Sequence, residues 1–186
     1  MAIILASASP RRQELLRNAG ISFLVRPTNI PELQKQGERP RDFAERMARE
    51  KALTAELNSP QDVVLAADTI VVVDGQVLGK PENPADASHM LHLLSGRTHE
   101  VITGVCLRGC DFQDVRSELT TVQFSELTER EISEYVASGE PMDKAGAYGI
   151  QGLASKWIPN IEGDYFNVVG LPVSLVWRML REHGTL

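Results

Sequence analysis

The sequence predicts a mixed α/β fold, in which a twisted and largely antiparallel sheet is flanked by helices. Apolar runs rich in β-branched residues alternate with segments whose apolar positions recur at helical spacing. Asp74-Gly75, a typical hairpin turn, follows the β-prone run at residues 63–73. Two further runs, residues 100–107 and 117–124, are spaced as a long antiparallel pair, which argues against a purely parallel sheet. We also expect two lobes around a central cleft.

Each element is expected where apolar periodicity and end signals agree. Strands are expected at residues 2–6, 21–25, 63–73, 76–79, 100–107, 117–124, 156–161 and 165–169. Helices are expected from Pro10 to Ala19, at about 41–57, at about 85–94, from Thr128 to near Gly139, and from Pro172 onward. Glycine follows several of these helices, and Thr128 with Glu131 forms a capping-box pattern.

Composition and charge exclude several classes of protein. The chain has 186 residues, a formal net charge of −6 and a pI near 5.3, so we expect no nucleic-acid partner. No apolar run is long enough to span a bilayer, so we expect no membrane partner. Cys106 and Cys110 are too few for a zinc site, and free thiols in the cytoplasm are the default expectation. The length suits a single domain over residues 1–186.

Residues 7–12, with the sequence SASPRR, join the first predicted strand to the first predicted helix. The proline suits the first helical position, and Ser9 suits the cap before it. The free N–H groups of the helix, the hydroxyls of Ser7 and Ser9, and the guanidinium groups of Arg11 and Arg12 can then surround an anion. Two interpretations are open here: a phosphate cradle, or a capped helix with a solvated first turn.

Asp68 interrupts a run, residues 63–73, that is otherwise apolar on both strand faces except for Thr69. A carboxylate in such a run loses hydration, so it needs a cation or hydrogen-bond donors, or it takes up a proton. Either outcome suits catalysis, as a magnesium ligand or as a base that deprotonates water. The competing interpretation is an aspartate at a strand bend that caps its own backbone, although no Gly or Pro marks a bend.

Two lysines also stand at unusual positions. Lys51 lies near the middle of the apolar arc of its predicted helix, where its ammonium either snorkels to the surface or reaches an anion in a cleft. Lys80 lies between Gly79 and Pro81, which suits a fixed cation that approaches a phosphate and equally suits an exposed turn.

A glycine-rich stretch at residues 143–152 is the last informative segment. Its three glycines at spacing three, 146, 149 and 152, do not suit a helix and allow a tight loop close to a flat ligand. Gln151 could read a nucleobase edge because its amide both donates and accepts, and Tyr148 could stack on a base or fill space.

Together these segments resemble the Maf family of nucleoside triphosphate pyrophosphatases, the septum-formation-inhibitor-like proteins. The match runs in one order along nearly the full length of the chain. It comprises residues 5–16 (LASASPRRQELL), 49–52 (REKA), 67–71 (ADTIV), 79–81 (GKP), 94–96 (LSG), 143–152 (DKAGAYGIQG) and 167–172 (NVVGLP).

The resemblance implies cleavage between the α- and β-phosphates with a divalent metal cation, Mg²⁺ or Mn²⁺, and it implies a role for each matching residue. Asp68 corresponds to the catalytic proton acceptor and, with Glu32, to the metal site, although the sequence around Glu32 lacks acids that many members carry there. The implied substrate-binding residues are Ser7, Arg11, Arg12, Lys51, Thr69, Lys80 and Gln151.

The glycine loop resembles that of the branch that acts on dTTP, UTP and modified uridine triphosphates. The 7-methyl-GTP branch has Ser and Glu where Tyr148 and Gln151 stand. The resemblance further implies removal of non-standard nucleotides, a link to cell-division arrest, and a cytoplasmic homodimer. Two other functions are open from the sequence: a nucleotide-binding regulator of division with incidental turnover, and a phosphatase on another metabolite.

Overall fold

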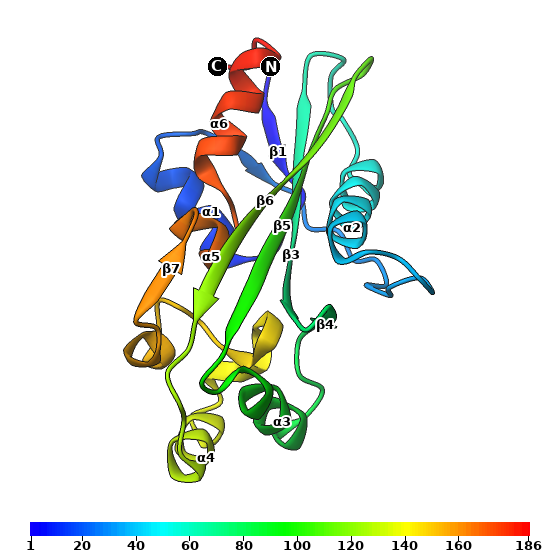
Figure 1. Cartoon of the computed structure of the whole chain (residues 1–186). Coiled ribbons are helices and arrows are strands. Elements are labelled where there is room, and N and C mark those ends of the chain that lie inside the picture. Colours follow the sequence, from blue (N-terminus) through cyan, green and yellow to red (C-terminus); the bar gives the residue numbers. More distant parts are fainter. The chain divides into compact units, whose positions relative to one another are not determined.

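The computed structural model describes residues 1–186 and shows an open, mixed sheet with the strand order β2-β1-β3-β5-β6-β7, in which β4 pairs with β3 (Figure 1). The strands are β1 (Ile3–Leu5), β2 (Leu24–Val25), β3 (Val63–Val73), β4 (Gln76–Leu78), β5 (Thr98–Arg108), β6 (Gln113–Gln123) and β7 (Asn160–Glu162). Pairs β1–β2 and β1–β3 are parallel, whereas β3–β4 and β6–β7 are antiparallel. The predicted mixed α/β class is therefore confirmed.

Six α-helices and three short 3₁₀ helices complete the fold. The α-helices are α1 (Pro10–Asn18), α2 (Pro40–Thr54), α3 (Pro84–Leu94), α4 (Glu129–Ala137), α5 (Tyr165–Val169) and α6 (Val173–Glu182). The 3₁₀ helices are η1 (Glu140–Asp143), η2 (Ala145–Ala147) and η3 (Leu153–Trp157). None of the helices combines the length and the apolar character that crossing a membrane requires.

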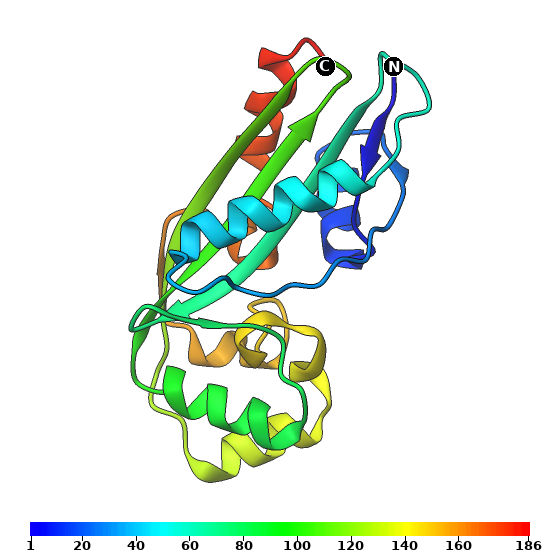
Figure 2. The same ribbon diagram turned by 90° about the vertical axis from the view of Figure 1, so that its right-hand side faces the viewer.

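The chain divides into two compact units, which correspond to the two lobes expected from the sequence. The first comprises residues 1–69, 103–118 and 170–186. Here α2 lies across the strands (Figure 2) and packs small residues such as Ala48 and Ala52 against Ile4 and Val64. The fit is tight at Gly104 of β5, where an added Cβ would lie 2.3 Å from the carbonyl oxygen of Ala44 in α2. The helix that carries Lys51 is therefore seated directly on the sheet.

The second unit comprises residues 70–102 and 119–169 and has a core of its own. Helices α3 and α4 pack together, and their buried faces meet Val71, Phe124 and Trp157. The predicted hairpin between β3 and β4 is confirmed, because Asp74 and Gly75 both have positive φ, 50° and 77°, as a type I′ turn requires. The cleft expected between two lobes stays a prediction.

One predicted strand is wrong, and a second is right only at its end. Residues 165–169 form the short helix α5, because the Asp164 carboxylate accepts hydrogen bonds from the N–H groups of Phe166 (2.7 Å) and Asn167 (3.4 Å). In the range 156–161, the first two residues end η3 and the last two begin β7, and residues 158 and 159 belong to neither. Both errors arose in short apolar runs, where periodicity cannot separate a strand from one or two helical turns.

Candidate active site

A buried ion pair lies in the first unit. The Lys51 ammonium of α2 donates to the Asp68 carboxylate of β3, with Nζ and Oδ1 2.6 Å apart. Both residues are almost fully buried, at 8% and 5% exposure. The same Nζ lies 2.6 Å from Oε1 of Glu32, whose side chain is 43% exposed. One ammonium thus joins two carboxylates, and the three side chains together carry one negative charge.

This arrangement decides between the interpretations of Asp68 and Lys51. Strand β3 continues through residues 63–73, so Asp68 does not cap a strand bend. Its carboxylate meets a cation, as a buried charge requires. Lys51 does not snorkel to the surface, because the alanines that seat α2 on the sheet bring its ammonium directly to Asp68.

Arg12 forms a second network beside this cluster. Its Nε donates to the Gly170 carbonyl oxygen (2.8 Å) and its Nη1 to the carbonyl oxygen of Ala67 (2.8 Å) and to Oγ of Ser7 (3.3 Å). Its Nη2 donates to Oγ1 of Thr69 at 3.0 Å. Four of the five guanidinium N–H groups are thus engaged with the protein. Arg12 holds the backbone and side chain on either side of Asp68.

The charges around Arg12 show which other groups are near. Burial lowers the pKa of Arg12, whereas the negative charges of Asp68 and Glu32 raise it and the positive charge of Arg11 lowers it. These four groups are therefore within electrostatic reach of one another. The guanidinium remains protonated in any case, as arginine does in proteins.

The start of α1 has the predicted cap. Ser9 is the N-cap residue, its hydroxyl accepts from the Arg12 N–H at 3.4 Å, and Pro10 opens the helix. The Ser7 hydroxyl is buried and accepts from the Ser9 N–H at 3.2 Å. The capped helix is thus confirmed, and the helix start lies beside the two arginines as the phosphate cradle requires. Phosphate binding at this turn stays a prediction.

Sequence reasoning missed Thr103 and Gly170, which complete the surroundings of Thr69. The two threonine hydroxyls are 2.9 Å apart, and Thr69 also donates to the Gly170 carbonyl oxygen at 3.2 Å. Gly170 has a φ of +128°, a conformation that favours glycine. The sequence offered only two signals for these residues: the Thr103-Gly104 pair inside an apolar strand, and a glycine before Leu-Pro at position 170. Neither signal specifies a partner.

Lys80 and Gln151 belong to the second unit. The Gly146 N–H donates to the carbonyl oxygen of Gly79 at 2.9 Å, which joins the glycine-rich loop to the segment that carries Lys80. Tyr148 fills space rather than offering a face for stacking: it is 5% exposed, its hydroxyl lies 2.7 Å from Nε2 of His99, and its ring packs edge-on against Phe124. Gln151 is exposed.

The carboxylates of Glu32 and Asp68 are the groups that could hold a divalent cation. Their oxygens flank one cation, the Lys51 ammonium, and carboxylate oxygens are the donors that Mg²⁺ and Mn²⁺ prefer. The structure contains no cluster of three or more acidic, histidine or cysteine side chains that would form a complete cage. Two carboxylates suit a metal that is held jointly with the phosphates of a substrate.

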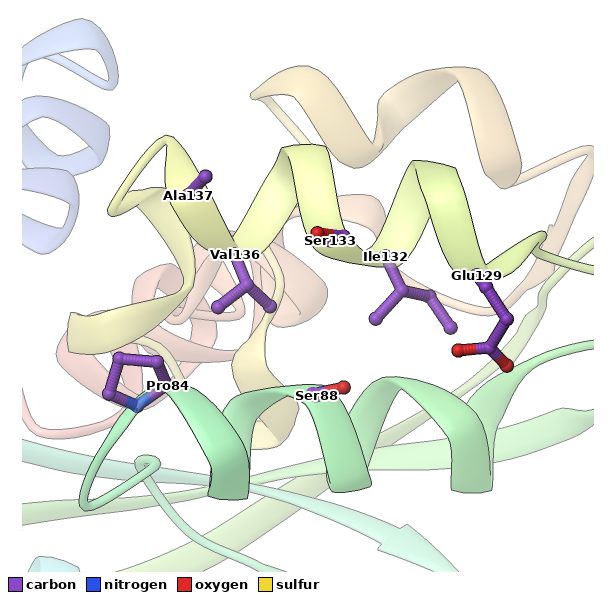
Figure 3. A pocket seen from close by; sticks show the side chains of 7 residues that line it. All are labelled: Pro84, Ser88, Glu129, Ile132, Ser133, Val136 and Ala137. Atoms are coloured by element: carbon purple, nitrogen blue, oxygen red, sulfur yellow. The ribbon is translucent and has the colours of Figure 1, made fainter.

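A groove of about 480 Å³ between α3 and α4 offers different chemistry (Figure 3). Ile132 and Val136 of α4 point toward α3, and Glu129 is the one charged residue of the lining, which also contains Pro84, Ser88, Ser133 and Ala137. A lining without cations does not suit a triphosphate. None of the residues predicted for the site lies in this groove.

Comparison with known proteins agrees with the resemblance seen in the sequence. A family model described as "Maf-like protein" matches residues 2–183. A protein named "dTTP/UTP pyrophosphatase" from Koribacter versatilis is 55% identical over 186 residues, which are 100% of this chain and 96% of that protein. Proteins of the same name from Syntrophomonas wolfei and Symbiobacterium thermophilum are 54% and 52% identical, and the matches cover 97% and 98% of this chain and 97% and 94% of those proteins. The chain therefore belongs to the Maf-like family.

Proposed function

We propose that the protein is a nucleoside triphosphate pyrophosphatase, which hydrolyses dTTP and UTP to the monophosphate and pyrophosphate and whose residues 1–186 work as one domain. The names of its relatives support the reaction and the substrates. The observation that carries the proposal is the buried Asp68 carboxylate held by Lys51 beside two arginines. Such a site joins a base to the cations that a triphosphate requires.

Each side chain then has a role in the displacement at the α-phosphorus. Asp68 orients a water molecule and takes its proton, while the water oxygen bonds to the α-phosphorus. The bond from that phosphorus to the oxygen that bridges to the β-phosphate breaks, and pyrophosphate leaves with the bonding electrons. Arg11, Lys51 and Lys80 compensate the charge of the phosphates, and the Ser7 hydroxyl contacts them.

Arg12 and Thr69 are proposed to contact substrate while they hold the site. Arg12 donates four hydrogen bonds to the protein, so one N–H, at Nη2, is left for a phosphate oxygen. The hydroxyl of Thr69 is placed by Arg12, Thr103 and Gly170. A substrate contact through either residue would therefore be geometrically precise.

A divalent cation, Mg²⁺ or Mn²⁺, would be held by Glu32 and Asp68. When bound, such an ion neutralises phosphate charge and polarises the phosphoryl oxygens. Glu32 is half-exposed, so its carboxylate can leave Lys51 without an unpaired charge being buried. Asp68 would keep its contact with Lys51, which continues to orient it.

Gln151 is proposed to read the nucleobase with its amide. Modified uridine triphosphates are within the same chemical class. The physiological role that we propose is therefore removal of non-standard nucleotides, with an effect on cell division. Because nucleoside triphosphates are kept in the cytoplasm, the same proposal places the protein there. We also propose a homodimer, which size-exclusion chromatography with light scattering would test.

The test is product release from dTTP, UTP, CTP and 7-methyl-GTP with Mg²⁺ or Mn²⁺, with pyrophosphate and orthophosphate measured separately. We expect pyrophosphate from dTTP and UTP, and a loss of about 100-fold or more in kcat for Asp68→Asn, in the range of a missing general base. Asp74→Asn is the matched control, because Asn accepts the positive φ of that turn.

The other outcomes separate the alternatives. Activity on 7-methyl-GTP alone would reassign the substrate and keep the reaction. Orthophosphate as the first product would indicate a phosphatase. Tight binding of dTTP without any product would support a nucleotide-binding regulator.

A further inference from the structure

The turn that carries Gln151 is held at both of its ends by two residues from outside the glycine-rich loop. The N–H of Gly152 donates to the carbonyl oxygen of Gly149 at 3.0 Å, which closes a turn with Ile150 and Gln151 at its centre. Ile150 is buried, whereas the side chain of Gln151 is exposed. The position of Gln151 thus depends on what fixes the two ends of the segment 149–153.

Tyr135 and Glu140 provide these two fixed points. The hydroxyl of Tyr135, at the end of α4, accepts from the Gly149 N–H at 3.3 Å and donates to Oε1 of Glu140 at 2.9 Å. Both carboxylate oxygens of Glu140 accept from the Leu153 N–H, at 3.1 Å each. The two side chains therefore form one connected clamp, with one end of the segment on the phenol and the other on the carboxylate.

The clamp explains why residue 152 is a glycine, which the backbone conformation at this position does not explain. Gly152 has a φ of −100°, which any residue can adopt. A Cβ at this position would, however, lie 2.0 Å from Oε1 of Glu140. A side chain at position 152 would therefore displace the Glu140 carboxylate, which passes directly over it.

Packing keeps both members of the clamp in place. Tyr135 is 3% exposed, and its ring packs edge-on against Trp157 at 5.2 Å. Burial and the hydrogen bond to Glu140 raise the pKa of Tyr135, so the phenol keeps its proton and remains a donor. The Lys144 ammonium donates to the backbone oxygen of Glu140 at 2.6 Å, which fixes the start of η1.

We propose that Tyr135 and Glu140 are positioning residues that set the affinity and base selectivity of the enzyme by clamping the turn that presents Gln151. The proposal rests on the proposed function only in taking Gln151 as the group that reads the base. Neither residue touches substrate in this proposal. Their loss should therefore weaken recognition of the base and leave the chemical step near its normal rate.

The test compares Tyr135→Phe, Glu140→Ala and Gly152→Ala with wild type in pyrophosphate release from dTTP, UTP and CTP. We expect the KM for dTTP and UTP to rise about tenfold and kcat to change less than about threefold. The preference for dTTP over CTP in kcat/KM should fall by a similar factor. Glu134→Ala is the matched control, because Glu134 lies on α4 in an exposed pair with Arg130 and should behave as wild type.

A double variant, Glu140→Ala with Gly152→Ala, distinguishes loss of the clamp from a general loss of folding. Since Gly152→Ala acts by displacing Glu140, it should add nothing in a Glu140→Ala background, and the two changes should be strongly non-additive in KM. Additive effects would overturn the clamp. So would variants that lose kcat or folded fraction while KM and selectivity stay at the wild-type values, because that pattern indicates a purely structural role.

Calorimetric binding of an α,β-imido analogue of dTTP separates this proposal from the proposed function. We expect Glu140→Ala to bind the analogue about tenfold more weakly than wild type. If wild type binds the analogue but releases no pyrophosphate, the proposed function fails and the affinities of the variants still decide the clamp. If wild type turns over dTTP while the variants keep its KM and affinity, the clamp fails and the function stands. If wild type neither binds nor converts, both fail.

Discussion

Arg11 and Arg12 are neighbours in the chain with different surroundings. Arg12 donates to two backbone carbonyl oxygens and two hydroxyls, which fixes the position of its fork. The first turn of α1 also carries Arg11, which is partly buried and whose positive charge acts on Arg12. At the scale of single residues, Arg12 is thus chiefly a part of the scaffold around Asp68, and we expect Arg11 to compensate phosphate charge.

This difference predicts different effects for the same substitution: lower stability at Arg12 and a higher KM at Arg11. Arg12→Lys removes a planar fork that an ammonium cannot reproduce, so we expect it to destabilise the protein by about 2 kcal/mol and lower the melting temperature by about 4–8 °C. Arg11→Lys should leave the melting temperature within about 2 °C and raise the KM for dTTP about tenfold.

Thermal unfolding and steady-state kinetics of both variants check this prediction. Arg17→Lys, on the exposed side of the same helix, is the control and should change neither quantity. Equal melting temperatures for the Arg11 and Arg12 variants would contradict the division of roles.

At the scale of elements, helix α2 is the part whose position matters most for the site. It carries Lys51, and Lys51 reaches Asp68 because α2 lies close to the strands. The approach depends on residues without bulk: alanines on the helix and Gly104 on β5. The packing of α2 on the sheet therefore also determines whether Lys51 reaches Asp68.

Gly104→Ala should disturb both the packing of α2 on β5 and the position of Lys51 in the site. The new Cβ would lie 2.3 Å from the Ala44 carbonyl oxygen and 2.7 Å from the Glu45 nitrogen, so the helix backbone must shift. We expect a loss of about 3 kcal/mol in the free energy of unfolding and a fall of about tenfold or more in kcat. Chemical denaturation and kinetics measure the two effects.

Gly79→Ala is the control for stability, because no atom lies within 4 Å of its added Cβ and its φ is not positive. A Gly104→Ala variant that is as stable as wild type would show that α2 can move away from β5 without cost.

At the scale of the whole molecule, stability should depend on pH through one buried histidine. Burial lowers the pKa of His99 to about 4, against an ordinary value near 6.5. Above pH 6.5 the ring is neutral in the folded and the unfolded states. As the pH falls below 6.5 the unfolded chain takes up a proton that the folded chain does not, so the folded state loses stability.

Between pH 7.5 and pH 5, this linkage should lower the free energy of unfolding by about 2 kcal/mol. Urea unfolding at several pH values tests it, with His99→Gln expected to flatten the dependence and the exposed His89→Gln expected to retain it. His92 is exposed, and Glu129 raises its pKa, so His92 weakly opposes the loss of stability that His99 causes as the pH falls. Asp114 and Glu38 have lowered pKa values, and their contribution is lost only below about pH 4. A His99→Gln variant with the wild-type slope would contradict the assignment.

Most of the fold could be predicted from the sequence. Asp74-Gly75, the Ser9-Pro10 helix start and the Thr128 capping box were identified correctly, because each depends on backbone geometry within a few residues. The predictions failed at residues 165–169, where five mostly apolar residues carry no usable period and the cap is a single aspartate.

The sequence by itself determined the residue types of the site and the family to which the chain belongs. Asp68 and Lys51 could be singled out because a charge in an apolar pattern costs free energy unless something compensates it. Their partners could not be named, since 17 residues separate Lys51 from Asp68, 19 separate it from Glu32, and periodicity carries no information across such distances. Only the tertiary structure decided that the charges of Lys51 and Asp68 compensate each other. It also decided that Arg12 donates a hydrogen bond to Gly170, 158 positions further along the chain. In the same way, it decided that Tyr135 and Glu140 hold the turn of Gln151. The physical reason is that these contacts depend on how closely helices approach strands, which packing sets and local sequence does not.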